Sequence, residues 1–510
     1  MLLARSGGAA LALVAALGPA GCVETPCGPR LSCEVPGVIL IPDERPCVAD
    51  PRAGLVDDGC GVFVSASLGD DAAAGTRGAP VKTIAEAVKR AADGPGRAYA
   101  CAEVFEEAAR VPAGVAIWGG LDCRAGWIYV GDQVRTVIAP GPDEVPLTFL
   151  PGEGVSLAAD VEARAADAAL PGGSSVAAIA QPGATVEILR AELAAGDGAR
   201  GRDGAPGHPR NQPARAGLPG DSGGEACTLE VVHGGAQVQT ACEGLVSIGG
   251  QGGQGTASAG GPGLSGELSP VPNPYGFGLG GWGASVARGC MNGSVGDNGE
   301  DGAHGAGARR GGRLTPAGYA GVDGADGGQG RPGQGGGGGG GSLAGLMFCG
   351  PGGKDGGAGG GSGGSGGCGG RGGRGGGHGG ASIGLISVNA EVSVRASVIT
   401  TGRGGDGGIG GFFQIGGAPG PAGIGGRGAG GSPFGCDGGT GGKGGNGGHG
   451  GGGLGGPSIG VAYLFGAPPK LEGVSYAVGA AGAGGQGANP DVLGSAGEDG
   501  EAGESLGFPP

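Results

Sequence analysis

The pattern of apolar and polar residues between positions 61 and 200 predicts short strands and one helix. TIAEAVKRAA at 83–92 places Ile84, Ala87, Val88 and Ala91 on one face at the helical period of 3.6 residues. Short apolar runs that are typical of strands stand before and after it, at 62–64, 115–118, 136–138 and 147–150. We therefore expect a helix near the start of a chain of short strands.

Three later segments repeat one strand-like pattern, with an apolar third residue (Ile188, Val394, Leu471) and a glycine after ten residues. They are VEILRAELAAG (186–196), VSVRASVITTG (392–402) and PKLEGVSYAVG (469–479). Each follows another strand-like run, at 176–180, 383–388 and 459–465, and QVQTACEGLVSIGG (237–250) is a weaker fourth copy. Stacked parallel coils need such recurring segments, because inward apolar side chains meet those above and below. Chance alternation in a Val- and Ala-rich sequence is the alternative.

Glycine-rich inserts follow the repeats and dominate the composition. Glycine supplies 141 of 510 residues against 3 Trp, 6 Tyr and 10 Phe, so a layered core cannot run the full length. Many inserts have period three, as in Asp437, Thr440, Lys443, Asn446 and His449, each separated by two glycines. This period matches a polyproline-II helix and allows a polyglycine-II bundle. Flexible loops are the alternative, and we favour loops or partly ordered bundles because glycine-rich runs normally behave as random coil.

Composition and charge exclude several classes of protein. Collagen needs more proline than the 36 present and an unbroken glycine period. A hydrophobic fraction of 38% argues against a charged disordered chain. The net charge of −15 argues against nucleic-acid binding, which needs clustered Lys and Arg.

The first residues predict export and lipid anchoring. Arg5 precedes an apolar run, AALALVAAL at 9–17, which is too short to span a bilayer. Pro19-Ala20-Gly21-Cys22 follows and resembles a bacterial lipobox, although leucine is usual where Pro19 stands. We expect a signal peptide at 1–21, a lipidated Cys22 and attachment to the outer membrane or cell surface. An ordinary secretory signal is the alternative.

The cysteine count supports both lipidation and disulfides. There are 13 cysteines, and removing an acylated Cys22 leaves an even set of twelve. Zinc sites are not indicated, because no C-x2-C pair occurs. We predict the local pairs Cys101 with Cys123 and Cys227 with Cys242, the second closing a strand–turn–strand around Gly234-Gly235. The other disulfide candidates among the glycine inserts are Cys290, Cys349, Cys368 and Cys436.

The stretch 61–200 also carries a resemblance. Gly75-Thr76, Pro80, Thr83-Ile84, Ala87-Val88 and Ala91 resemble the N-terminal cap of pectin-lyase-like right-handed parallel β-helices. VFEEAARVPAGVAIWGGLDC (104–123), with Trp127 after it, is similar to the first coils of Gly-rich lipoproteins of δ-proteobacteria. The resemblance implies an all-β fold, a right-handed parallel β-helix with a short N-terminal capping helix and long Gly-rich inserts. It implies no activity.

No group of residues predicts catalysis or cofactor binding. Glu187, Glu192, Ser393, Ser397 and Glu472 on the repeats form no cluster of the kind that glycoside hydrolysis needs. Gly377-His378-Gly379 and Gly448-His449-Gly450 resemble the GHG element of polygalacturonase-like enzymes but stand inside glycine runs. Gly404-Gly405-Asp406 and Gly201-Arg202-Asp203 resemble only fragments of a calcium repeat. We therefore predict no catalytic, metal or cofactor residue.

These observations give one organisation and one function. The expected parts are the signal at 1–21, a spacer at 22–60, first coils at 61–200, glycine inserts with interspersed rungs at 201–380, and final rungs at 381–510 around an array at 402–458. We expect a non-enzymatic surface lipoprotein with a structural or adhesive role toward glycans or matrix. A carbohydrate-active β-helix enzyme and an ice- or surface-binding protein are the alternatives.

Overall fold

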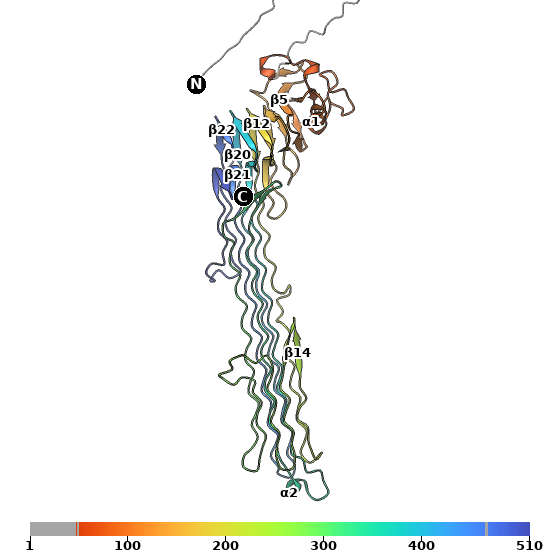
Figure 1. The fold of residues 1–510 in the computed structure, drawn as a ribbon, viewed down its shortest axis with the longest axis vertical. Helices are drawn as coiled ribbons and strands as arrows, with labels where there is room; N and C mark the ends of the chain where they lie inside the picture. The colour runs from red at the N-terminus through yellow and green to blue at the C-terminus, as the bar shows by residue number, and fades with distance from the viewer. Residues whose placement is uncertain (1–46, 48–49, 465–467, 510) are drawn as a thin grey trace, which may run out of the picture. The chain divides into compact units, whose positions relative to one another are not determined.

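The computed structural model describes residues 47, 50–464 and 468–509, and the chain is mostly β (Figure 1). The expected signal peptide, Cys22, Cys27 and Cys33 lie outside these residues. Within the described part, no helix has the length and apolar character needed to cross a membrane.

Three sheets of parallel strands collect strands from residue 62 to residue 508. The first contains β1 (Val62–Val64), β2 (Arg97–Cys101), β5 (Ala116–Asp122), β9 (Val155–Ala159), β12 (Thr185–Leu189), β19 (Glu391–Arg395) and β22 (Lys470–Glu472), with β6 (Ile128–Tyr129) antiparallel to β5. The second contains β3 (Val104–Phe105), β7 (Thr136–Ile138), β10 (Val161–Arg164), β13 (Glu192–Ala195), β20 (Val398–Thr401) and β23 (Ser475–Ala477). The third contains β4 (Ala109–Val111), β8 (Leu147–Phe149), β11 (Ser175–Ala180), β18 (Ser382–Ser387), β21 (Ser458–Leu464) and β24 (Ala502–Phe508).

The chain visits the three sheets in turn, so successive strands stack in register. Ile188 pairs with Val394 in the first sheet, and Val394 pairs with Leu471. The third positions of the three sequence repeats therefore align, as the repeat predicts. The preceding runs align as well, because Val176 pairs with Ile383 and Ile383 with Ile459. Ile188 and Val394 belong to the main apolar core, whereas Val176, Ile383 and Ile459 form part of a second buried cluster and Leu471 is exposed.

The predicted helix is present as α1 (Ile84–Ala92) and packs on the first strands. Thr83 caps its N-terminus by accepting a hydrogen bond from the backbone N–H of Glu86 at 3.2 Å. Its four predicted apolar residues are all buried, and they join the core that β1, β2 and β4 form. The helix thus covers apolar side chains where β1 and β4 begin their sheets and would otherwise expose them.

The glycine inserts leave the sheets at one corner and form a hydrogen-bonded bundle. Each lies between a strand of the second sheet and the next strand of the third, at 196–381, 402–457 and 478–501. Figure 1 shows extended segments of the inserts running side by side between the sheets and α2 (Leu346–Cys349). Each such segment of the single polypeptide is called a chain of the bundle below. We call residues 197–224, 249–266, 278–308, 321–342, 356–381, 402–428, 435–457 and 478–501 the glycine bundle.

Backbone hydrogen bonds in the bundle repeat every three residues. Gly293, Gly296, Gly299, Gly302 and Gly305 donate to the carbonyls of residues 437, 440, 443, 446 and 449, at 2.7–2.9 Å. Segment 356–381 is surrounded by other segments. The N–H groups of its Ser362, Gly363 and Gly364 donate to three different neighbours, at the carbonyls of Asp221, Gly250 and Gly439. Of the prediction that favoured loops or partly ordered bundles, the part that favoured flexible loops is therefore wrong. Sequence alone favoured coil because the bonds that order these segments all come from distant residues.

Glycine is required at the inner positions because neighbouring chains lie too close for a side chain. A Cβ added at Gly363 would overlap the carbonyl oxygen of Gly336. At the surface of the bundle, most non-glycine residues of the triplets face solvent, as Lys443 does between the buried Gly442 and Gly444, whereas Ser362, Ser365 and Cys368 of the central segment are buried. The period of three is thus, in the surface segments, the repeat of two inner positions and one outer one.

Four short elements complete the fold. The antiparallel hairpin of β14 (Gln239–Cys242) and β15 (Leu245–Ile248) lies beside the bundle, whereas the hairpin of β16 (Arg313–Thr315) and β17 (Gly318–Ala320) packs near β21 of the third sheet. The 3-10 turns η1 (Pro51–Ala53) and η2 (Asp58–Cys60) precede β1 at the sheet end of the molecule. The weak fourth repeat at 237–250 forms the first hairpin. The prediction that it is a further rung is wrong, because its alternating residues pair locally and antiparallel rather than with distant parallel strands.

Candidate functional site

Five disulfides fasten the described chain, and one predicted pair is wrong. Cys101 and Cys123 are joined as predicted. Cys227 pairs with Cys349 and Cys242 with Cys368, in place of the predicted pair Cys227–Cys242. Cys290 pairs with Cys436, and Cys47 with Cys60. The expected turn around Gly234-Gly235 does not form either: the hairpin turns after Cys242, and Gly235 instead donates to Gly360 of another chain.

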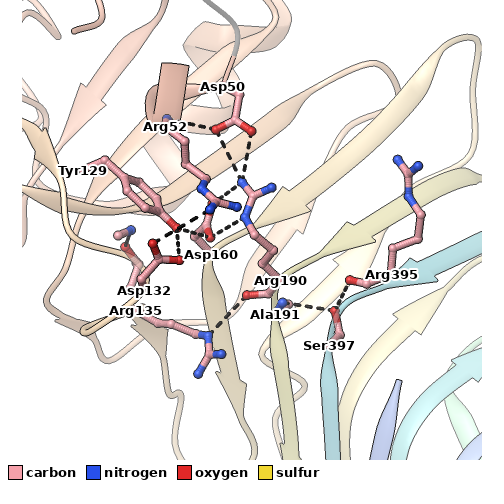
Figure 2. Close-up of polar contacts among 12 residues, drawn as sticks. Asp50, Arg52, Tyr129, Asp132, Arg135, Asp160, Arg190, Ala191, Arg395 and Ser397 are labelled. Atoms are coloured by element: carbon pink, nitrogen blue, oxygen red, sulfur yellow. Dashed lines mark hydrogen bonds and ion pairs between the residues drawn. The ribbon is translucent and has the colours of Figure 1, made fainter. Parts of the chain in front are cut away.

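A group of charged residues around the buried Asp160 lies where the first sheet passes to the second (Figure 2). Asp160 follows β9, Arg190 follows β12, and both have left-handed backbone conformations, with φ of 57° and 50°. Stacking of these corners brings the two side chains together. Arg190 donates to both carboxylate oxygens of Asp160, at 2.8 and 2.7 Å, and Asp160 is only 1% exposed. The Tyr129 hydroxyl donates to Asp160 at 2.8 Å, and Asp50 lies 3.3 Å from Arg190.

The electrostatics of this group suit a structural role. The hydrogen bond to Asp160 raises the pKa of Arg190 above its ordinary value, so the guanidinium stays charged. Burial, and then the hydrogen bond to Asp160, raise the pKa of Tyr129, so its hydroxyl stays a donor. Neither group can act as a general base near neutral pH. The bidentate pair instead joins two successive corners, which sequence analysis missed because the residues are 30 positions apart.

The polar residues of the repeats are brought near this corner but share no cleft. Glu192 pairs with Arg135 at 3.3 Å, and Glu187 pairs with Arg395. Ser397 accepts a hydrogen bond from the backbone N–H of Ala191 and donates to the carbonyl of Arg395 (Figure 2). Ser393 lies in β19 opposite Glu187, whereas Glu472 is exposed at the end of β22. Glu187 and Glu192 therefore each already have a cationic partner.

The two GHG histidines lie on different chains with different partners. His378 contacts Asp323, whose Oδ1 atom is 2.7 Å from Nδ1 and also accepts the His378 backbone N–H. His449 is 8% exposed and stacks on His304 with ring centroids 5.2 Å apart. The His449 backbone N–H donates to Nδ1 of His304 at 3.0 Å. Burial, and then the neighbouring His304, lower the pKa of His449.

Side-chain oxygens cap the outward backbone N–H groups of the bundle. Asn292, Asn298 and Asp301 accept from residues 437, 443 and 446 at 3.0, 2.8 and 2.6 Å, as the His304 nitrogen does from His449. The calcium-like fragments have the same role. Asp203 accepts from Ile409, and Asp406 accepts from Ala483, both at 2.8 Å. The period of three places a side-chain acceptor beside several of the edge amides, which accounts for part of the acidic composition.

Within the described residues, no group of three or more His, Cys, Asp or Glu side chains is arranged to hold a metal ion. Comparison with known proteins adds no relative: no family model, no curated protein and no solved structure matches the chain. The features that bear on function are therefore the glycine bundle, its disulfides and its exposed side chains.

Proposed function

We propose that this chain is a non-enzymatic lipoprotein of the cell surface with a structural or adhesive role. In this proposal a lipid on Cys22 anchors it, and the three sheets form a right-handed parallel β-helix that carries a polyglycine-II bundle. The relation to Gly-rich lipoproteins of δ-proteobacteria, which the residues at 61–123 suggest, is part of the same proposal.

The observation that carries the proposal is the glycine bundle itself. Its inner residues use their backbone groups to bind neighbouring chains, and only one residue in three presents a side chain to solvent. Two of the disulfides join positions of the inserts that are 122 and 146 residues apart in the sequence. Such construction supports a stiff surface that carries few reactive groups, as a spacer or adhesin needs.

The alternatives draw less support from the described residues. A polysaccharide hydrolase needs two or three carboxylates facing one cleft, whereas Glu187 and Glu192 each pair with an arginine. An ice-binding face would need regular ranks of Thr or Ala. The outward residues at 437, 440, 443 and 446 are instead Asp, Thr, Lys and Asn.

The anchor is tested by incorporation of labelled palmitate in a bacterium that processes lipoproteins, with Cys22→Ala as the control. We expect label on the wild-type chain and none on the variant. Label on Cys22→Ala, or a mature N-terminus elsewhere, would contradict the anchor while leaving the rest of the proposal standing.

The role is tested with the exported chain on a glycan array and in a panel of polysaccharide assays. We expect glycan or matrix binding without release of reducing ends or unsaturated products. The enzyme alternative is tested in parallel with Asp323→Asn, which removes the carboxylate beside His378. Product release that disappears in Asp323→Asn would overturn the non-enzymatic proposal.

A further inference from the structure

One chain of the bundle carries a continuous apolar stripe. Its outward residues at every third position from 409 to 424 are all apolar and all exposed. They are Ile409, Phe412, Ile415, Ala418, Pro421 and Ile424. Phe412 is 60% exposed and Ile424 is 67% exposed. We call these six residues the apolar stripe.

The stripe contrasts with the chain beside it. Residues 435–457 run antiparallel to the stripe, with Gly441 bonded to Gly420 and Gly447 to Gln414, and their outward residues are mostly polar. Most backbone N–H groups of the stripe also lack the side-chain acceptors found elsewhere in the bundle. Asp203 caps the N–H of Ile409, but the N–H groups of Phe412, Ile415, Ala418 and Ile424 have no partner among the described residues. The bundle thus leaves its apolar surface and these donors uncovered together.

The stripe is complementary to itself when a second copy is reversed. With the centre between Ile415 and Ala418, reversal places these two residues opposite each other, a large side chain against a small one. It also places Phe412 opposite Pro421, and Ile409 opposite Ile424.

The charges beyond the stripe obey the same symmetry. Reversal places Asp406 at one end opposite Arg427 at the other. Arg427 forms no ion pair with any described residue, whereas Asp406 pairs with Arg403 at 2.9 Å. A parallel arrangement would instead bring like charges together, which is unfavourable. The charge pattern therefore favours the antiparallel one.

We propose that two copies of this chain associate through the apolar stripe, antiparallel and related by a two-fold axis between Ile415 and Ala418. At ~3.1 Å per residue the stripe is about 47 Å long. A face that is three neighbouring segments of the bundle wide, with about 4.8 Å between segments, therefore has an area of roughly 700 Å² per copy. A standard interface buries about 800 Å² per partner, so the face is large enough for a reversible dimer. The interface is isologous, since each copy supplies the same residues.

The test measures the mass of the exported chain by sedimentation, at concentrations from about 1 to 100 μM. All variants carry Cys22→Ser, so that lipid does not contribute to association. We expect a monomer–dimer equilibrium that Ile415→Asp abolishes. The matched control is Val295→Asp, which introduces the same charge at an exposed aliphatic residue of segment 278–308, outside the proposed face, and should leave the dimer unchanged.

A second measurement tests the register. Ile415→Cys combined with Ala418→Cys should form a covalent dimer on oxidation, because these positions face each other across the proposed axis. Ile409→Cys combined with Ala418→Cys should not, since those positions do not meet. A wild-type monomer at every concentration, an Ile415→Asp variant that still associates, or a covalent dimer only in the mismatched pair would each overturn the proposal.

Discussion

Cys242 and Cys368 are 126 positions apart in the sequence, and a disulfide joins them with their Cα atoms 5.3 Å apart. In the chain-entropy model, closing a loop of this length stabilises a fold by about 4.7 kcal/mol, against about 3 kcal/mol for a loop of ~15 residues. We expect Cys242→Ser with Cys368→Ser to lower the free energy of unfolding in urea by about 4–5 kcal/mol. Cys47→Ser with Cys60→Ser, which opens a loop of 13 residues, should cost less.

The same disulfides predict which cysteine peptides remain linked after digestion without reduction. Peptides that carry Cys227 should be linked to Cys349, and those that carry Cys242 to Cys368. A linked peptide pair joining Cys227 to Cys242 would contradict this pairing and restore the local one.

The bundle should not tolerate a methyl group at an inner position. A Cβ at Gly442 would overlap the carbonyl oxygen of Asp297, so Gly442→Ala must separate two bonded chains. We expect a loss of about 1–3 kcal/mol in the free energy of unfolding, as for an overpacked core. Lys443→Ala, one residue away and exposed, is the control and should stay within about 0.5 kcal/mol of wild type. Equal stability of the two variants would show that the chains are not in contact.

Hydrogen exchange should follow the three-residue repeat. The N–H groups of Gly439, Gly442, Gly445 and Gly448 donate to distant carbonyls at 2.7–2.9 Å and should be protected. The N–H of Thr440 has no partner among the described residues, so it should exchange quickly and serves as the internal control. Fast exchange at all five positions would mean that this segment is a loop in solution.

Removing the carboxylate at the sheet corner should be costly. Asp160→Asn leaves Arg190, whose side chain is 16% exposed, without its bidentate partner. Breaking such a buried pair costs about 3–5 kcal/mol, and we expect the lower part of this range because Asp50 remains beside Arg190. Asp132→Asn is the control, since its side chain is 68% exposed and its contact with Arg52 is 3.9 Å long. Thermal unfolding that ranks the two variants the other way would contradict the structural role.

The buried His449 should make stability depend on pH. Because burial lowers its pKa in the folded protein, the unfolded chain binds more protons around and below pH 6.5. Stability should therefore fall as the pH is lowered through this range, before most carboxylates titrate. Thermal unfolding between about pH 7.5 and 5 should show this slope in the wild type and a flatter profile in His449→Phe. Identical profiles would assign the slope to other groups.

Several elements follow from local patterns that the sequence displays directly. Ile84, Ala87, Val88 and Ala91 predict α1 because a helix places residues at this spacing on one face. The repeats at 186–196, 392–402 and 469–479 predict strands that stack, and their Ile188, Val394 and Leu471 do align. Cys101 and Cys123 pair correctly because their strands are adjacent coils with a short connection.

The wrong predictions for the disulfide pair and for the fourth repeat have one physical cause: the long inserts fold back, so that residues distant in the sequence become neighbours. The predicted pair Cys227–Cys242 is near in sequence, yet the chain of 356–381 comes back to supply Cys368 to Cys242. The weak repeat at 237–250 has the residues of a rung, but the bundle lies beside it and no parallel strand does. Proximity along the chain is a poor guide where hydrogen bonds join residues 145 positions apart.

The sequence by itself determined the period of three, the strand and helix positions near the start, and the absence of a large aromatic core. These are properties of neighbouring residues, since they depend on which side chains share a face or a turn. Only the tertiary structure decided that the glycine runs are ordered, because each of their backbone hydrogen bonds needs a carbonyl from another segment of the polypeptide. It also decided that Asp203, Asp301 and His304 cap amides and that six apolar residues form an uncovered stripe, since both depend on which chains lie next to one another.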